Sequence, residues 1–162
     1  MMRIVAPHRV AHTYVQRLAG PPEDVFPLLC PVREVDWVPG WDPREVITQS
    51  GFAEPQCVFF TGPTDNESIW VVTAYAPPES VEFIKVTPGE TVGCISIRLR
   101  AGAEGETHAE VTYEYTSLGE RGTSVVDAFT AEHYDRFMRD WERALNHYLR
   151  TGTRLEPPPA AA

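Results

Sequence analysis

The sequence predicts an α+β fold in which an antiparallel sheet of about seven strands packs on one long C-terminal helix. Alternating apolar and polar residues, broken by turn signals, fill the region from residue 44 to 118. Residues 123–150 instead repeat their apolar side chains at helical spacing. A sheet with one apolar face must bury that face, and this helix is the only element of matching length.

The first strand and two short helices precede the main run of strands. Residues 8–18 alternate as a strand does, and Ala19, Gly20 and Pro21 end it. The sequence Pro-Pro-Glu-Asp at 21–24 is typical of a helix start, with acids near the positive end of the helix dipole. Because Pro27 cannot donate a backbone hydrogen bond, residues 22–36 are predicted to form two short helices rather than one long helix.

Six further segments rich in β-branched and aromatic residues predict an antiparallel meander. Gly, Pro, Asn and Asp fill the turns between them. Polar residues separate Ile95, Ile97 and Leu99, and also Tyr113 and Tyr115, so one face of the sheet should meet water. The predicted strands are residues 44–49, 56–61, 68–75, 81–87, 91–101 and 107–118.

The long helix carries an unusually aromatic stripe. Such a stripe is usually core, but with one histidine it could also form the lid of an apolar cavity, and both interpretations stay open. Gly152 is suited to closing the helix. The predicted stripe consists of Val126, Phe129, His133, Phe137, Trp141, Ala144, Leu145 and Tyr148.

Composition indicates one domain over residues 8–152 with a disordered Pro/Ala tail at 153–162. The net charge of -9 and the dispersed basic residues argue against nucleic acid as a partner. No apolar run approaches the roughly 20 residues of a membrane span, and the chain starts without a signal region, so we expect no membrane insertion and a cytoplasmic location. Oligomeric state cannot be inferred from the sequence, which leaves a homodimer open.

Metal and cofactor motifs are missing from the sequence. Cys30, Cys57 and Cys94 form no Cys-x-x-Cys pair, which argues against both a disulfide framework and a zinc site. The five histidines are scattered, and no P-loop, dinucleotide fingerprint or nucleophile elbow occurs. We therefore expect neither a metal nor a cofactor.

Aromatic residues are the candidates for a ligand site. Trp37 and Trp41 flank a Pro-Gly turn and could plug the core or form the rim of a cavity. The remaining candidates for the cavity wall each have an alternative as plain packing residues, and they are Phe59, Trp70, Tyr113, Tyr115, Phe137 and Trp141.

Two residues are candidates for proton chemistry. His133 on the predicted stripe is the stronger candidate, although a core histidine with one hydrogen bond is the commoner arrangement. Glu34 could act as a general base if it points inward beside Trp37, but the adjacent Arg33 favours a solvated acid.

The order of a strand, two short helices, six strands and a long helix resembles the helix-grip fold of the START-like, pollen-allergen and polyketide-cyclase superfamily (SRPBCC). Three stretches carry the likeness: Ala19-Gly-Pro-Pro-Glu-Asp-Val-Phe-Pro-Leu-Leu, Val111-Thr-Tyr-Glu-Tyr-Thr-Ser-Leu-Gly and Trp141-Glu-Arg-Ala-Leu-Asn-His-Tyr-Leu. The resemblance spans residues 8–152. It implies a curved sheet around the long helix with an apolar cavity between them, as in members that bind lipids, hormones or polyketides.

Two functions follow from this resemblance and from the residues. The first is binding of a small hydrophobic or aromatic molecule, which needs only an apolar cavity with a few polar groups. The alternative is a polyketide cyclase-like or dehydratase-like enzyme, with His133 and a tyrosine as acid and base. A fold of this kind hosts many activities, co-chaperones included, and the lack of a recognisable acid–base pair favours binding.

Overall fold

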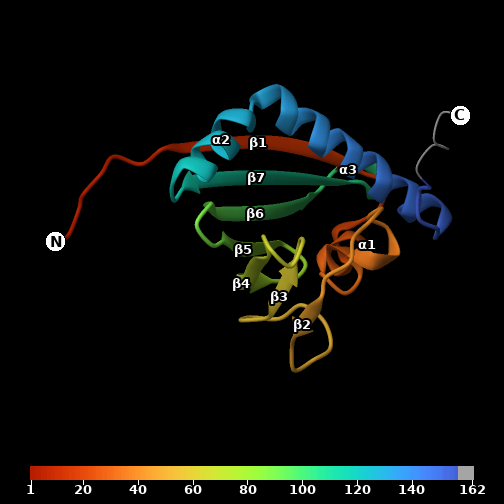
Figure 1. The fold of residues 1–162 in the computed structure, drawn as a ribbon. Coiled ribbons are helices and arrows are strands. Elements are labelled where there is room, and N and C mark those ends of the chain that lie inside the picture. Colours follow the sequence, from red (N-terminus) through yellow and green to blue (C-terminus); the bar gives the residue numbers. More distant parts are fainter. Residues whose placement is uncertain (157–162) are drawn as a thin grey trace, which may run out of the picture.

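The computed structural model describes residues 1–156, so most of the predicted disordered tail lies outside the described residues. Seven strands form one antiparallel sheet in the order β1-β7-β6-β5-β4-β3-β2, with α2 and α3 running alongside β1 and β7 (Figure 1). The strands are β1 (Arg9–Leu18), β2 (Glu45–Ile47), β3 (Val58–Thr61), β4 (Ser68–Ala76), β5 (Ser80–Thr87), β6 (Thr91–Ala101) and β7 (Thr107–Ser117). The predicted fold class is confirmed, with strand limits close to those expected.

The predicted pair of short helices is a single helical turn followed by two 3-10 segments. These are α1 (Pro22–Val25), η1 (Phe26–Leu29) and η2 (Glu34–Asp36). Val25, Phe26 and Leu29 are buried, so the segment closes one end of the core. A third 3-10 turn, η3 (Ala103–Gly105), joins β6 to β7.

The predicted helix over residues 123–150 is two helices, α2 (Glu120–Ala128) and α3 (Ala131–Thr151). Phe129 leaves the helical conformation, and the Thr130 hydroxyl accepts a hydrogen bond from the backbone N–H of His133, which starts α3 with an N-cap. Gly152 closes α3 in the left-handed conformation, as expected.

This break changes which residues of α3 face the sheet. The buried residues of α3 are Tyr134, Met138, Ala144 and Leu145, whereas His133 is exposed and Phe137 is 40% exposed. The predicted stripe is therefore one residue out of phase in the first two turns of α3. An unbroken helix from residue 123 would have kept His133 and Phe137 in phase with Val126, and the break at Phe129 removes that relationship.

Side-chain hydrogen bonds to main-chain groups fix α3 on β1 and β7. Gln16 donates to the carbonyl of Met138 at 3.1 Å, and the Tyr134 hydroxyl donates to the carbonyl of Val111. Asn146 accepts from the N–H of Ala19 at 2.8 Å and donates to the carbonyl of Arg17 at 2.9 Å. These contacts fix the height at which α3 lies above the sheet.

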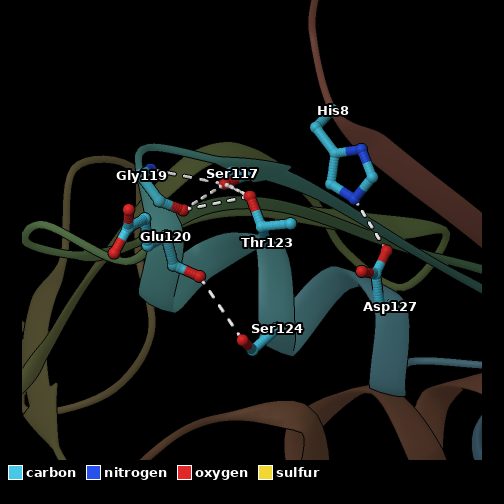
Figure 2. Close-up of polar contacts among 7 residues, drawn as sticks. All are labelled: His8, Ser117, Gly119, Glu120, Thr123, Ser124 and Asp127. Atoms are coloured by element: carbon cyan, nitrogen blue, oxygen red, sulfur yellow. Dashed lines mark hydrogen bonds and ion pairs between the residues drawn. The ribbon is translucent and has the colours of Figure 1, made fainter.

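The start of α2 is tied to the end of β7 by short polar contacts (Figure 2). The Ser117 hydroxyl donates to the carbonyl of Gly119 at 2.8 Å and lies 3.1 Å from the Thr123 hydroxyl. At the other end of α2, Asp127 pairs with His8, the residue before β1, at 2.8 Å. Gly122 permits a close approach, because a Cβ there would lie 1.8 Å from the carbonyl oxygen of Glu90. No helix within residues 1–156 is long and apolar enough to cross a membrane.

Candidate functional site

A partly enclosed cavity of about 150 Å³ lies between the inner face of the sheet, η2 with the loop after it, and α3. Seven of its eleven described lining residues are aromatic, and one is charged. The lining residues are Glu34, Val38, Trp41, Phe59, Trp70, Phe83, Ile95, Ile97, Tyr113, Phe137 and Trp141. The cavity is thus a mainly aromatic enclosure with a single carboxylic acid.

Strand alternation brings the sheet residues of this lining to one face. Phe59 pairs across β3 and β4 with Trp70, and their rings stack with centroids 5.3 Å apart and planes 14° apart. Phe83 on β5 meets both rings edge-on, at centroid distances of 6.2 and 6.0 Å. The packing fixes these three side chains, so this wall is pre-formed.

The two tryptophans after η2 have different roles. Trp37 is completely buried, donates its indole N–H to the carbonyl of Leu28 at 2.8 Å and packs on Trp141 with centroids 5.3 Å apart. Trp41 donates to the carbonyl of Pro31 at 2.8 Å and lines the cavity. Of the two interpretations left open by the sequence, the structure places Trp37 as a plug and Trp41 in the wall.

Glu34 contributes the only carboxylate of the described lining. Among residues 1–156 its side chain makes no hydrogen bond or ion pair, although the neighbouring Arg33 pairs with Asp36 at 2.8 Å. Burial among apolar side chains raises the pKa of Glu34 to about 8. The sequence interpretation favoured a solvated acid, whereas the structure directs Arg33 to Asp36 and Glu34 into the cavity lining.

The two tyrosines on β7 also differ. Tyr113 lines the cavity, and its hydroxyl makes no hydrogen bond within the part of the chain that the structure describes. Burial, followed by the neighbouring Tyr115 and Glu34, raises the pKa of Tyr113. Tyr115 is buried beside the cavity and meets Phe129 edge-on at 5.0 Å rather than contributing to the lining.

Lys85, the single lysine of the chain, lies next to this wall. Its ammonium nitrogen is 5.0 Å from the ring centre of Trp70 and 5.8 Å from that of Tyr115. Burial lowers the pKa of Lys85, and Glu90 opposes this effect. Lys85 pairs across the sheet with Gly93, over which the ring of Tyr115 lies, so the lysine and the tyrosine share the same inner face.

His133 does not line the cavity. It is exposed on α3, with its ring 5.8 Å from that of Phe129. The break at Phe129 turns it outward, and this position corrects its predicted role in proton chemistry inside the site.

A larger groove of about 720 Å³ lies outside the cavity and shares part of its lining. Val38, Phe137 and Trp141 line both spaces. Leu155 and Glu156 also line the groove, although they fall within the segment predicted to be disordered. Three side chains therefore separate the inner cavity from an outer groove.

The structure brings together most of the predicted wall residues and adds several others. Trp41, Phe59, Trp70, Tyr113, Phe137 and Trp141 line one cavity, whereas Trp37, Tyr115 and His133 lie outside its lining. Sequence reasoning missed Val38, Phe83, Ile95 and Ile97 as lining residues, although strand alternation had placed Ile95 and Ile97 on the apolar face of the sheet. Within residues 1–156 no group of three or more His, Cys, Asp or Glu side chains could hold a metal ion.

The fold matches solved structures at low sequence identity. No protein-family model and no curated protein matches the chain. Norcoclaurine synthase from Thalictrum flavum aligns at a TM-score of 0.64 and 12% identity, over 90% of this chain and 88% of the synthase. The Mll3558 protein from Rhizobium loti aligns at 0.62 and 13%, over 88% and 99% of the two chains.

A third similar structure is DynU16, a protein of the dynemicin biosynthetic locus. It aligns at a TM-score of 0.57 and 18% identity over 88% of this chain, which spans 48% of DynU16. At these identities the likeness concerns the fold. The sheet order, the long C-terminal helix and these matches together show that the chain has the fold of these structures, which is the helix-grip fold that the sequence was expected to adopt.

Proposed function

We propose that the protein binds a small aromatic molecule in the cavity between the sheet, η2 and α3. The observation that carries this proposal is a partly enclosed, mostly aromatic space whose polar side chains, Glu34 and Tyr113, make no hydrogen bond within residues 1–156. Both residues are half-buried and line the cavity, so a ligand with a polar substituent would find hydrogen-bond partners there.

The volume of the cavity supports a ligand about the size of one ring. An engineered apolar cavity of roughly 150 Å³ in another protein binds benzene, whereas pockets for drug-sized ligands hold roughly 300–1,000 Å³. A longer ligand, such as a lipid or a polyketide, would have to extend past Val38, Phe137 and Trp141 into the outer groove. A single ring with a short polar substituent therefore fits best.

A related structure gives further support. A point mutant of norcoclaurine synthase from Thalictrum, which has the same fold and is 10% identical to this chain, was solved in complex with a transition-state analogue. A protein with this fold can thus hold a small organic molecule. We also propose that residues 8–152 form a single domain and that the protein acts in the cytoplasm.

One observation favours the alternative, a cyclase-like or dehydratase-like enzyme. A carboxylic acid with a pKa of about 8 can exchange a proton near neutral pH, which is what a general acid or base requires. Glu34 would take the role first assigned to His133, and the Tyr113 hydroxyl would donate a hydrogen bond to the substrate. Binding remains the leading function because it needs only the cavity.

The test begins with native purification and mass spectrometry of extracted small molecules. The identified molecule is then titrated against the protein, with tryptophan fluorescence as the readout because Trp41, Trp70 and Trp141 line the cavity. Saturable binding with unchanged recovery of the molecule supports a binding protein. Conversion of the molecule by wild type, but not by folded Glu34→Gln that still binds it, would establish the enzyme instead.

A further inference from the structure

We propose that the preferred ligand is a cation, an aromatic molecule whose ammonium group pairs with the Glu34 carboxylate inside the cavity. This inference rests on the proposed function and specifies the ligand class for the same site. It follows from the charge, the unpaired state and the surroundings of Glu34.

The described lining of the cavity combines one acidic side chain with many aromatic rings. Glu34 is the only charged residue among the eleven described residues around the cavity, and Trp41, Phe59, Trp70, Phe83, Tyr113, Phe137 and Trp141 supply the aromatic wall. Aromatic rings attract cations through the negative electrostatic potential of their faces. A carboxylate within a set of aromatic rings is an arrangement that favours an organic ammonium ion over an anion.

Lys85 shows that an amine side chain lies against the aromatic rings of this face, although burial there lowers its pKa. Its nitrogen lies 5.0 Å from the Trp70 ring centre, and Lys85 makes no ion pair in residues 1–156. Lys85 is not part of the cavity lining, so it does not neutralise Glu34 there. Burial is the cause of the raised pKa of Glu34, and no neighbouring positive charge lowers it.

Among residues 1–156, the other elements that pack near Glu34 place no cation in the cavity lining. β7 contributes Tyr113, whose phenol is uncharged at neutral pH and whose pKa burial raises further. α3 contributes Asp140 and Arg143, but both line the outer groove rather than the cavity, and Arg143 pairs with Asp140 at 3.1 Å. The positive charge that would balance an ionised Glu34 is left for the ligand.

Binding of a cation should release a proton. In the empty cavity Glu34 is mostly protonated at pH 7, because its pKa is about 8. An ammonium group that binds next to it favours the ionised carboxylate, so the proton of the carboxyl group passes to the buffer. Affinity for the cation should therefore rise as pH rises from 6 to about 8, until Glu34 is ionised without the ligand.

Three probes of nearly equal shape test this inference: benzylamine, benzyl alcohol and benzoate. Each is titrated by tryptophan fluorescence against wild type, Glu34→Gln and the control Glu45→Gln, which changes an exposed glutamate on β2. We expect benzylamine to bind wild type at least about tenfold more tightly than benzyl alcohol, and benzoate most weakly. Glu34→Gln should remove the preference for benzylamine, and Glu45→Gln should keep it.

Calorimetric titration of the wild-type protein with benzylamine, in two buffers of different ionisation enthalpy, measures how many protons are released on binding. Release of close to one proton per benzylamine at pH 7 supports the inference, and absence of release overturns it. Benzyl alcohol binding as tightly as benzylamine also overturns the cation preference while leaving the proposed function intact. If none of the three probes binds, the proposed function fails together with the inference.

Discussion

Glu34 of η2 and Tyr113 of β7, which are far apart in the sequence, line the same cavity, and neither side chain has a hydrogen-bond partner within residues 1–156. Burial is the main cause of the raised pKa of both groups, and Glu34 adds to the effect on Tyr113. Two polar groups in an apolar space weaken the fold unless a ligand contacts them. The contribution of Glu34 and of Tyr113 to stability can therefore be measured by replacing each side chain in turn.

Glu34 should make the protein less stable as pH rises. Its pKa of about 8 in the folded state exceeds that of an unfolded glutamate, about 4.3, so the folded state binds more protons between these values. The free energy of unfolding should fall through this window by up to about 3–5 kcal/mol and then level off. Urea unfolding of wild type and Glu34→Gln at pH 5, 7 and 9 measures it, and a pH dependence identical in both proteins would contradict the prediction.

Tyr113→Phe should leave the stability of the protein nearly unchanged, within about 0.5 kcal/mol, because the lost hydroxyl has no partner in residues 1–156. Tyr134→Phe is the matched control. The Tyr134 hydroxyl donates to the Val111 carbonyl, so Tyr134→Phe removes a buried hydrogen bond and should reduce stability by about 1 kcal/mol. Equal losses in thermal unfolding would show that the Tyr113 hydroxyl is not free.

Trp141→Ala should destabilise the protein by about 3 kcal/mol, because it removes the ring that packs on Trp37 and lines both the cavity and the groove. Trp141→Phe keeps an aromatic ring at this position and should lose less than half as much. Chemical denaturation followed by circular dichroism compares the two. A loss below about 1 kcal/mol for Trp141→Ala would indicate that this contact contributes little.

Thr130→Ala should reduce stability by about 1 kcal/mol, because it removes the hydroxyl that caps α3 through the N–H of His133. Thr130→Ser retains the hydroxyl and should stay close to wild type. If both variants lose the same stability, packing of the threonine methyl group rather than the cap is responsible.

Lys85 should react slowly with amine-specific acylating reagents in the folded protein, because its amine is shielded beside the rings of Trp70 and Tyr115. The lowered pKa of Lys85 acts in the opposite direction, since it increases the fraction of unprotonated amine, so the reaction reports shielding. Mass spectrometry after a short treatment should find label at the N-terminus and little at Lys85. Treatment in denaturant is the control and should label both amines. Rapid labelling of Lys85 in the native state would mean that solvent reaches the amine.

The strand pattern of the sheet could be predicted because alternation and turn residues are local signals. Ile95, Ile97 and Tyr113 lie on the inner face as the alternation indicated, and the predicted strand limits differ little from those observed. The helix break could not be inferred from apolar spacing alone. Phe129 continues the helical spacing of apolar residues, and only Thr130, with an acidic Glu132 in the following turn, signals a new start.

The cavity itself depends on tertiary contacts. Glu34 has a basic neighbour in sequence, and only the direction of Arg33 towards Asp36 shows that the acid is free of it. Trp37 and Trp41 have the same residue type and neighbouring positions, but the first packs on Trp141 and the second lines the cavity. Which aromatic side chain fills space and which encloses it is decided by packing between elements.

The single lysine also gives the protein a built-in spectroscopic probe. Selective ¹⁵N-lysine labelling would produce one backbone amide resonance, from residue 85, without any need for sequential assignment. That amide lies on β5, directly opposite Trp70 in the sheet register and two residues from Phe83. A shift of this one signal on titration would report an event at the aromatic wall, and its line shape would give the exchange rate of the ligand.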